Sequence, residues 1–348
     1  MSAGLAIKLL IYRTSSSKIG RKMLNLLSFG LSVNCLDGKH KPKNHKFIVA
    51  ITTDTESGYV EDNEKRVWQI ENPKAYQGYY YGMRNLLKIF SRNKVKTTFF
   101  ISTNCFSSKG RELKLIKKEF GNLIKNKHEI GLHMHPDSDL ALQQKLSRKF
   151  PATSAFFYDY GEKLELVSAA KKIIGENLGI SAEKNLVSFR WGNWAMDTDG
   201  AKAIGEFGFK IDSSAVPGIK GHSDDTMRYD WSKVSMHYQW KLSTLEYQSI
   251  SHNSSVTEIP IATFSFFWVK MRADPVNSVF LEKAFLEYYN NADRSKKPFV
   301  FVVITHSSEA TKKDGSSTQV CTDLERFIEF AKKYKDVEFA TLKTAGKL

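Results

Sequence analysis

Strand-like and helix-like segments alternate along most of this chain, and the alternation restricts its possible folds more than any other feature of the sequence. The apolar run Phe47-Ile48-Val49-Ala50-Ile51 predicts a strand buried on both faces, as strands of parallel sheets are. Further strands are expected at about 97–102, 129–133, 186–190, 209–212, 256–260, 298–305 and 337–341, and helices at about 74–92, 109–126, 160–178, 197–206, 276–292 and 321–334. Strands alternating with helices predict a parallel sheet. This many of them predict an α/β fold, a distorted (β/α) barrel of seven or eight strands.

A basic segment precedes the first predicted strand. Residues 1–46 contain nine lysine or arginine residues and one aspartate, so they contribute a net charge of +8 to the chain's +15. We expect residues 1–46 to be a partly amphipathic N-terminal extension and residues 47–348 to be one large domain. The extension can make peripheral contact with an anionic membrane, or it can pack as a basic arm on the protein's own surface. Both interpretations stay open.

Targeting signals are weak. The longest uncharged apolar run near the start, residues 23–36, has 14 residues, fewer than the roughly 20 that span a bilayer. The order Arg21-Lys22 and then apolar residues is that of a signal peptide, but polar residues interrupt the run and no small-residue cleavage site follows. Three scattered cysteines without CxxC spacing favour a reducing compartment. We expect a cytoplasmic protein, peripheral on the inner face of the membrane if the extension binds lipid, rather than a secreted one.

The positive net charge also raises nucleic-acid binding as a function. No helix-turn-helix, zinc-finger or RNA-binding aromatic motif is present, and the basic excess lies mainly in the extension. Nucleic acid is therefore not an expected partner.

The stretch from His128 to Asp137 contains three of the nine histidines and two carboxylates. Imidazole and carboxylate are the usual ligands of catalytic metal sites that keep one position open for water. His133, His135 and Asp137 follow the point where a buried strand would end, whereas His128 stands at its start. The pattern predicts a metal site, although histidines that occur by chance in a surface loop are the alternative.

Four other predicted strands end in polar or charged residues. Because the carboxyl ends of parallel strands share one face of a barrel, these residues should converge with the histidines on one cleft. The residues are Asp54 and Glu56, then Arg190, then Asp212, and finally His306. Taken alone, His306 is better interpreted as a histidine that caps the barrel core.

The order and spacing of these strand ends resemble the polysaccharide deacetylase family, the NodB-homology carbohydrate esterases, across about residues 47–341. The motifs that carry the resemblance are Thr52-Thr53-Asp54-Thr55-Glu56, Lys127 to Asp137, Phe189-Arg190-Trp191-Gly192-Asn193-Trp194, Phe209 to Ser214 with Pro217, Glu258-Ile259-Pro260 and the strand that ends in His306. The resemblance implies a catalytic domain over residues 47–348.

The family's roles can be carried onto matching residues. Asp54 would be the catalytic base, Arg190 would pair with it, and His306 would be the general acid for the leaving nitrogen. Substrate contacts are expected from five further residues, namely Trp191, Asn193, Trp194, Asp212 and Glu258. The aromatic-rich loop at 217–257 could stack on sugar rings or simply pack on the barrel.

The metal site departs from the family pattern. Thr55 stands where the family usually has its metal carboxylate, so Glu56 is the nearest substitute, with His133 as a further ligand. The family's second histidine would fall at Asp137, and His135 could replace it if the chain turns differently. A divalent ion is expected, with Zn²⁺ first and Mn²⁺, Co²⁺ or Fe²⁺ as alternatives in an oxygen-rich site.

The resemblance implies a metal-dependent deacetylase, a hydrolase of linear amides. It would remove N-acetyl or related N-acyl groups from a sugar during biosynthesis of surface polysaccharide, such as lipopolysaccharide or capsule, or of a lipid-linked glycan. Its partner would be an acetylated sugar or glycan, lipid-linked or free. Two alternatives remain: a catalytically inactive member of the fold that binds glycans, and a deformylase of a lipid-linked amino sugar.

Overall fold

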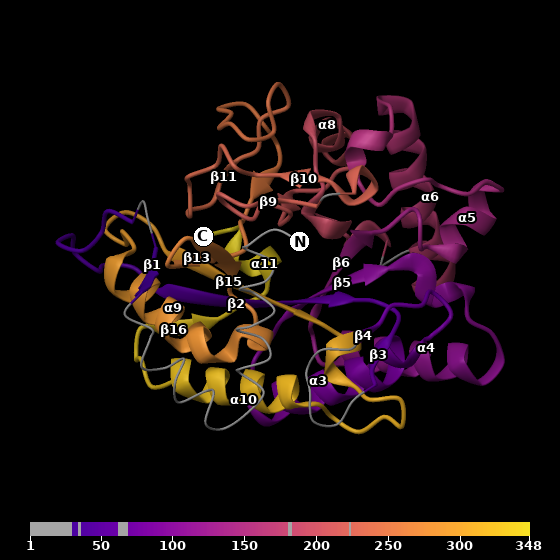
Figure 1. The fold of residues 1–348 in the computed structure, drawn as a ribbon, viewed down its shortest axis with the longest axis horizontal. Coiled ribbons are helices and arrows are strands. Elements are labelled where there is room, and N and C mark those ends of the chain that lie inside the picture. Colours follow the sequence, from indigo (N-terminus) through magenta and orange to yellow (C-terminus); the bar gives the residue numbers. More distant parts are fainter. Residues whose placement is uncertain (1–29, 34–35, 62–68, 180–182, 223) are drawn as a thin grey trace.

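One curled sheet organises the computed structural model, which describes residues 30–33, 36–61, 69–179, 183–222 and 224–348 (Figure 1). Its strands are β2 (Phe47–Thr55), β5 (Thr98–Ser102), β6 (Glu129–Met134), β7 (Ser188–Trp191), β8 (Ile211–Asp212), β11 (Trp240–Lys241), β12 (Thr257–Glu258), β15 (Phe299–His306) and β16 (Val337–Phe339). Their order is β11-β12-β8-β7-β6-β5-β2-β15, and β16 pairs with the first residues of β2. Within this sheet only the β11–β12 pair is antiparallel.

The two ends of this sheet approach each other. Ile261, just after β12, forms a parallel bridge with Val302 of β15, and the Ala262 amide donates to the Val302 carbonyl at 3.1 Å. The sheet therefore curls almost into a closed ring. The predicted distorted (β/α) barrel is confirmed.

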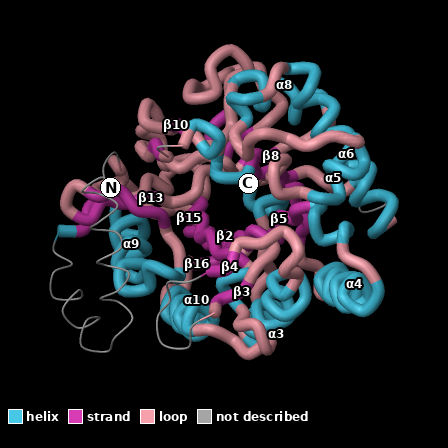
Figure 2. Tube along the Cα trace, turned by 45° about the vertical axis from the view of Figure 1, so that its right-hand side comes forward, coloured by secondary structure: helices cyan, strands magenta, loops and turns pink. Residues whose placement is uncertain are grey.

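Helices surround the outer side of the curled sheet (Figure 2). They are α3 (Met83–Arg92), α4 (Gly110–Lys125), α5 (Leu140–Leu146), α6 (Tyr160–Leu178), α8 (Thr198–Glu206), α9 (Ser278–Asn291), α10 (Gln319–Ala331) and α11 (Leu342–Ala345). Local sequence sets their ends. At the start of α6, for example, Asp159 and Glu162 form a capping box in which each side chain accepts from the other's backbone amide.

The burial of strand β2 explains why its sequence does not alternate between apolar and polar residues. All nine of its residues are buried. Ile48 and Ala50 belong to one hydrophobic cluster, and Phe47, Val49 and Ile51 belong to the other, on the opposite face of the strand. Because both faces are covered, both sets of side chains must be apolar.

The region before α3 differs from its prediction. The helix expected from residue 74 begins as a π-helical turn at Gly78–Gly82. A Cβ on Gly78 would lie 2.2 Å from the Glu56 carbonyl oxygen, and one on Gly82 would lie 1.9 Å from the Ser307 carbonyl oxygen. Glycine is needed at both positions because the helix start touches the backbone that follows β2 and β15. The short strands β3 (Tyr59–Val60) and β4 (Gln69–Ile70) form a separate antiparallel pair nearby.

Residues 261–275, where no element is expected from sequence, contain an antiparallel hairpin. It consists of β13 (Thr263–Phe266) and β14 (Val269–Arg272), and β1 (Leu31–Ser32) pairs with β13 on its other edge. The described part of the extension therefore joins the fold. Residues 1–29, on which the membrane and packing interpretations depend, lie outside the described residues.

The loop region 217–257 contains the short strand pair β9 (Lys220–Gly221) and β10 (Tyr229–Asp230), besides β11. Most of its aromatic side chains are buried: Trp231 is 0% exposed, and Tyr229, Trp240 and Tyr247 are all below 9%. These four therefore pack the loop onto the barrel, which was one of the two sequence interpretations. In the described ranges, no helix has both the length and the apolar character that crossing a bilayer requires.

Candidate metal and catalytic site

The carboxyl ends of β2, β6, β7 and β15 bring their polar residues together, as the parallel arrangement predicts. In the sheet register, His306 lies opposite Asp54 on the neighbouring strand, and His133 lies opposite Arg190. Glu56 follows β2 directly. This end of the barrel therefore collects carboxylates and imidazoles from four separate parts of the sequence.

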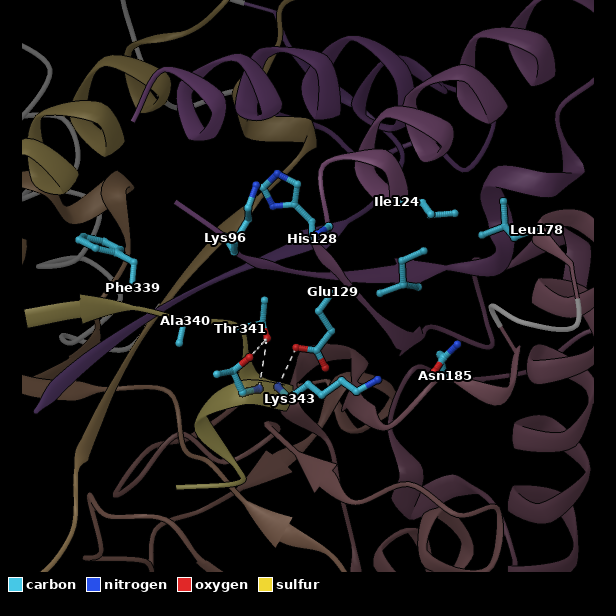
Figure 3. Close-up of a pocket in the computed structure, with 13 residues that line it drawn as sticks. Lys96, Ile124, His128, Glu129, Leu178, Asn185, Phe339, Ala340, Thr341 and Lys343 are labelled. Atoms are coloured by element: carbon cyan, nitrogen blue, oxygen red, sulfur yellow. Dashed lines mark hydrogen bonds between the residues drawn. The ribbon is translucent and has the colours of Figure 1, made fainter. Parts of the chain in front are cut away.

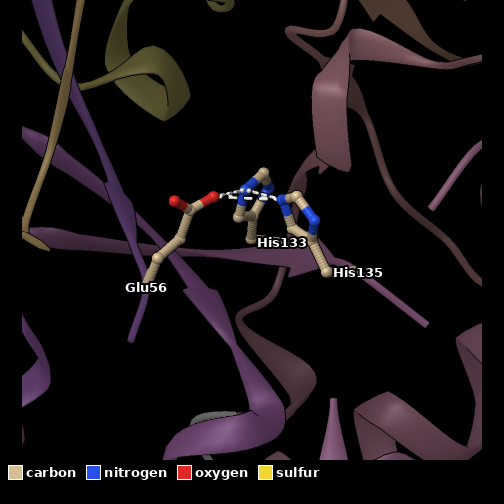
Figure 4. A group of neighbouring side chains, drawn as sticks. All are labelled: Glu56, His133 and His135. Carbon is tan, nitrogen blue, oxygen red and sulfur yellow. Dashed lines mark hydrogen bonds and ion pairs between the residues drawn. The ribbon is translucent and has the colours of Figure 1, made fainter. Parts of the chain in front are cut away.

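Three side chains converge on one point at this end (Figure 4). The Oε1 atom of Glu56 lies 2.9 Å from Nε2 of His133 and 3.0 Å from Nε2 of His135. The two Nε2 atoms are 3.1 Å apart. Ligand atoms that share one ion at ~2.0–2.2 Å lie roughly 3 Å from each other, so this group has the spacing of a metal-binding set.

The hydrogen bond behind His133 sharpens this interpretation. Its Nδ1 lies 3.1 Å from the carbonyl oxygen of Arg190, and since a carbonyl only accepts, Nδ1 must carry a proton. In neutral His133, Nε2 is then a bare acceptor that faces the carboxylate oxygen of Glu56. Two acceptors at this distance require a cation between them, either a second proton on the ring or a metal ion.

The charges of this group agree with that requirement. Burial acts to raise the pKa of Glu56, but contacts with His133 and His135 outweigh it and hold the pKa well below its ordinary value. Burial likewise acts to lower the pKa of His135, and the Glu56 carboxylate raises it instead. The lowered pKa means that the Glu56 carboxylate is ionised. The ionised form is the one that can bind a metal ion.

Asp54 and Arg190 form a buried ion pair beside this group. One Asp54 oxygen lies 2.5 Å from a guanidinium nitrogen, and the side chains are 3% and 0% exposed. Arg190 also donates from Nε to the Ser213 carbonyl at 2.8 Å, so its position is fixed from behind. The second Asp54 oxygen points towards two imidazoles, 3.7 Å from Nε2 of His133 and 3.9 Å from Nε2 of His306.

His306 is held by a carboxylate that the sequence motifs do not include. Its Nδ1 lies 3.2 Å from Oε2 of Glu309, which leaves Nε2 facing Asp54. Burial alone would lower the pKa of His306, but the charge of Glu309, with those of Glu56 and Asp54, raises it to about 10. His306 is therefore protonated at neutral pH, as a general acid must be.

Behind Glu309 lies a second charge pair. Asp274 is fully buried, and its carboxylate accepts from Arg272 at 2.9 Å and from the Val276 amide at 2.9 Å. Asp274, His306 and Glu309 have ligand atoms within 4.8 Å of one another. Two carboxylates, one guanidinium and one imidazole therefore share a small volume, in which burial and the charge of Glu309 raise the pKa of Asp274.

Ser307 ties the ends of β2 and β15 together. Its amide donates to the Asp54 carbonyl at 2.9 Å, and its hydroxyl accepts from the Glu56 amide at 3.0 Å. These bonds fix Asp54, Glu56 and His306 relative to one another. The sequence signals for the residues missed were small: a carboxylate three positions after His306, and an Asp-Pro helix start at Asp274.

The structure separates the two alternatives for the third metal ligand. Strand β6 ends at Met134, and the chain remains extended only long enough for His135 to share a side with His133. It then turns at Pro136, and Asp137 is exposed, where its carboxylate accepts from Thr153 at 2.6 Å. His135 is brought to Glu56, and Asp137 is not.

Three of the five residues expected to contact substrate have no exposed surface: Trp191, Asp212 and Glu258 are each 0% exposed. Trp191 donates from its indole to the Thr153 carbonyl. Burial, followed by repulsion from Asp212, raises the pKa of Glu258 well above its ordinary value, so we assign Glu258 as the protonated partner that hydrogen bonds to Asp212. A substrate cannot touch these three in this conformation because their side chains have no exposed surface.

Asn193 and Trp194 are partly exposed and directly follow β7. Their φ angles are +50° and +56°, a left-handed conformation that costs bulky residues energy and is common where backbone strain serves a site. The guanidinium of Arg272 lies 4.6 Å from the centre of the Trp194 ring. Trp194 is thereby linked through Arg272 and Asp274 to the surroundings of His306.

His128 lies at the opposite end of β6, as expected from sequence. There it lines a cavity of about 660 Å³ with Glu129, Lys96, Lys343 and other residues (Figure 3). Burial, together with nearby Lys96, lowers the pKa of His128 to about 4, so this histidine is neutral. The cavity is separate from the convergent histidines and carboxylates.

No family model and no curated protein sequence matches this chain. Solved structures do. One described as a polysaccharide deacetylase from Mycobacterium smegmatis has a TM-score of 0.55 and 16% identity, covering 91% of this chain and 94% of that one. One from Pseudomonas aeruginosa with the same description has a TM-score of 0.55 and 15% identity, covering 90% and 94%. PuuE allantoinase has a TM-score of 0.55 and 13% identity, covering 90% and 93%.

Identities this low show a shared fold and leave the reaction open, since proteins with different substrates in their names share it. The resemblance stated from the motifs is confirmed at the level of the fold. This chain has the distorted (β/α) barrel fold of the polysaccharide deacetylases.

Proposed function

We propose that this protein is a metal-dependent deacetylase that removes N-acetyl groups, or related N-acyl groups, from a sugar. The observation that carries the proposal is the set of three ligand atoms from Glu56, His133 and His135, all 2.9–3.1 Å apart, beside a buried Asp–Arg pair and a protonated histidine. Amide hydrolysis needs these groups together: a cation, a base and an acid.

The donor set fits a divalent ion. Two imidazoles and one carboxylate leave positions open for water and substrate, and His133 is oriented for ligation by its bond to the Arg190 carbonyl. Zn²⁺ is the first expectation, with Mn²⁺, Co²⁺ or Fe²⁺ as alternatives. When bound, such an ion would polarise the acyl oxygen and lower the pKa of a water molecule.

The chain's own residues would move the protons. Asp54, held in place by its ion pair with Arg190, would accept a proton from the attacking water. His306, kept protonated by Glu309, would donate a proton to the nitrogen as the C–N bond breaks. Water thus supplies the hydroxyl group of the acid product, and the sugar leaves as a free amine.

Exposure suggests where a substrate would enter. The side chains of Glu56, His135 and His306 are 25%, 17% and 14% exposed, whereas Asp54 and His133 are almost completely buried. The acyl group would therefore approach over the first three, with Asn193 and Trp194 as candidate sugar contacts beside them. We propose a sugar of surface-polysaccharide or lipid-linked glycan biosynthesis as the substrate class.

The test is a panel of N-acetylated nucleotide sugars and lipid-linked sugars, with acetate release measured in chelator-treated protein before and after adding a divalent metal. We expect metal-dependent release from at least one member. Formate release from N-formylated analogues in the same assay would identify a deformylase instead.

The alternative is a protein of this fold that binds glycans without hydrolysing them. Glycan binding by calorimetry, with no acyl release from any substrate in the panel and no bound metal, would favour it over the enzyme.

A further inference from the structure

The turn of the β13–β14 hairpin has an unusual composition. Phe266 pairs with Val269, so Phe267 and Trp268 form the two-residue turn. Their exposed fractions are 44% and 75%, and their ring centres are 5.9 Å apart. Phe267 has a φ angle of +51°. Two large aromatic residues therefore occupy a sharp, solvent-facing turn.

This composition conflicts with the chemistry of hairpin turns. Two-residue turns need positive φ angles, for which glycine, asparagine and aspartate are suited and a bulky aromatic residue is not. This cost falls on Phe267 and is of order 1 kcal/mol or more. Its neighbour Trp268 is three-quarters exposed, so the turn gains little burial from the larger ring. Residues that break a local rule without a local gain are candidates for a role outside the fold.

The base of the hairpin is rigid. Phe264, Phe266, Val269 and Met271 are buried in one cluster with Phe280 of α9. Both ribbon views show β13 on the side of the molecule away from α5 and α6 (Figures 1 and 2). The aromatic turn is therefore held firmly at one edge of the protein.

The N-terminal chain enters the fold at the same place. The Phe267 amide donates to the Gly30 carbonyl at 2.7 Å, and a Cβ on Gly30 would lie 2.7 Å from the Phe267 ring. Residues 1–29, which precede this contact, contain five lysine or arginine residues and no aspartate or glutamate. A strongly basic stretch of chain therefore begins beside the exposed aromatic pair.

We propose that the aromatic turn, Phe267 and Trp268, is a docking surface for an anionic lipid bilayer. Tryptophan is preferred at the boundary between headgroups and acyl chains, and a lysine or arginine that lies close to an anionic surface adds about 1 kcal/mol of attraction. Two side chains on a convex turn offer far less than the ~800 Å² per partner of a stable protein interface, which disfavours a second copy of the chain.

The proposal does not depend on the reaction proposed above, but it has a consequence for it. Strand β14 runs from the turn to Arg272, whose guanidinium contacts Asp274 near His306. Four residues of strand span ~13 Å. A docked turn would hold the catalytic site close to the bilayer, where a lipid-linked sugar would be presented.

The test is co-sedimentation of the full chain with vesicles of phosphatidylcholine containing about 30 mol% phosphatidylglycerol, compared with phosphatidylcholine alone. We expect Trp268→Ser to weaken binding to the anionic vesicles roughly tenfold, because one Trp side chain no longer enters the interface. Leu245→Ser is the matched control: Leu245 is 89% exposed but lies in the loop region 217–257, outside the β13–β14 hairpin, and its loss should change nothing.

Equal binding of wild type and Trp268→Ser, absence of binding to anionic vesicles, or equal binding to both vesicle types would overturn the proposal. So would a Trp268-dependent dimer in sedimentation velocity, which would identify a second copy as the occupant. Circular dichroism melting and acetate release from a soluble substrate should be the same in both variants. Failure of the proposed reaction would thus be seen separately from failure of docking.

Discussion

The two ends of strand β6 both carry histidine and lie beside a carboxylate, but they differ in how these polar groups are hydrogen bonded. At its start, His128 and Glu129 lie among donors supplied by the protein: Glu129 accepts from the hydroxyls of Thr98 and Ser188 and from the Lys343 amide at 2.5–2.8 Å. At its end, His133 and His135 face Glu56, and Nδ1 of His133 donates its proton to a hydrogen bond with the Arg190 carbonyl.

The comparison teaches that a high density of histidine and carboxylate does not by itself indicate a metal site. What distinguishes the two ends is whether the acceptors are satisfied by protein donors or face one another. The start of β6 is complete without any added cation, and the end is not.

Replacing the histidine at each end of β6 in turn should give the largest difference in metal affinity and in acetate release. His133→Ala removes a ligand atom, and we expect metal affinity to fall at least about 100-fold and acetate release about 1,000-fold. His128→Gln should leave both within about threefold, because its end of the strand lacks facing acceptors. Metal content is measured by mass spectrometry, and activity is measured as acetate release. Equal losses of metal and activity in the two variants would contradict the proposed difference between the two ends of β6.

Removing the base should separate chemistry from metal binding. Asp54→Asn is expected to lower acetate release about 1,000-fold while the bound metal stays within about threefold of wild type. The change leaves Arg190 buried without its carboxylate, which can cost about 3–5 kcal/mol of folding free energy. The double variant Asp54→Asn/Arg190→Gln is the control for folding: it should melt at a higher temperature than the single variant and be equally inactive.

The identity of the third metal ligand can be tested by substituting His135 and Asp137 separately. His135→Ala should lower metal affinity about 10- to 100-fold, whereas Asp137→Asn should change it less than about threefold. Calorimetric titration of each variant with Zn²⁺ measures this. Should Asp137→Asn be the weaker binder, the chain turns differently from the structure when metal is present.

The acid candidate gives a pH-dependent prediction. The negative charge of Glu309 stabilises the imidazolium form of His306, so its loss lowers the pKa of His306. Because the acid must carry a proton, the alkaline limb of the pH profile of kcat should move down by about 1 pH unit in Glu309→Gln. Glu287→Gln, on the surface of α9, serves as a control and should leave the profile unchanged. If the alkaline limb is not shifted in Glu309→Gln, Glu309 does not control the pKa of the general acid.

The smallest effect is expected at the start of β6. Burial, against the hydrogen bonds that Glu129 accepts, raises its pKa above the ordinary value. The protonated carboxyl therefore favours the folded state at low pH, and this contribution is lost as pH rises through the raised pKa. Glu129→Gln keeps a neutral group there, so the free energy of unfolding should fall less between pH 4 and pH 8, by about 1 kcal/mol. Urea unfolding at the two pH values measures it, and an unchanged pH dependence would contradict the assigned pKa shift.

Much of this architecture could be predicted because buried parallel strands leave strong signals. The apolar run of β2 and the polar residues at strand ends predict that five residues share one face of the barrel: Asp54, Glu56, His133, Arg190 and His306. Helix α6 has the bounds expected from sequence, 160–178, and its capping box and the glycine that follows it are local features of the chain.

What could not be predicted depends on the path of the chain between elements. The position of His135 beside Glu56, and of Asp137 away from it, follows from where β6 ends and how the chain turns at Pro136, which alternation alone does not determine. Asp212 and Glu258 are ionisable, which favours exposure, yet both are completely buried. It is Ser213, next to Asp212, whose carbonyl accepts from Arg190. The β13–β14 hairpin was missed because its strands are four residues long and their turn lacks the residues that usually mark one.

The central claim is that the facing acceptors at the end of β6 hold a catalytic metal ion. The most direct measurement is acetate release by chelator-stripped protein during stepwise addition of Zn²⁺, with an N-acetylated sugar that the panel identifies. The account predicts no activity without metal and a rise that ends at about one ion per chain, absent in His133→Ala but retained in His128→Gln. Activity that is the same in the stripped and the metal-loaded protein, with both correctly folded, would contradict it.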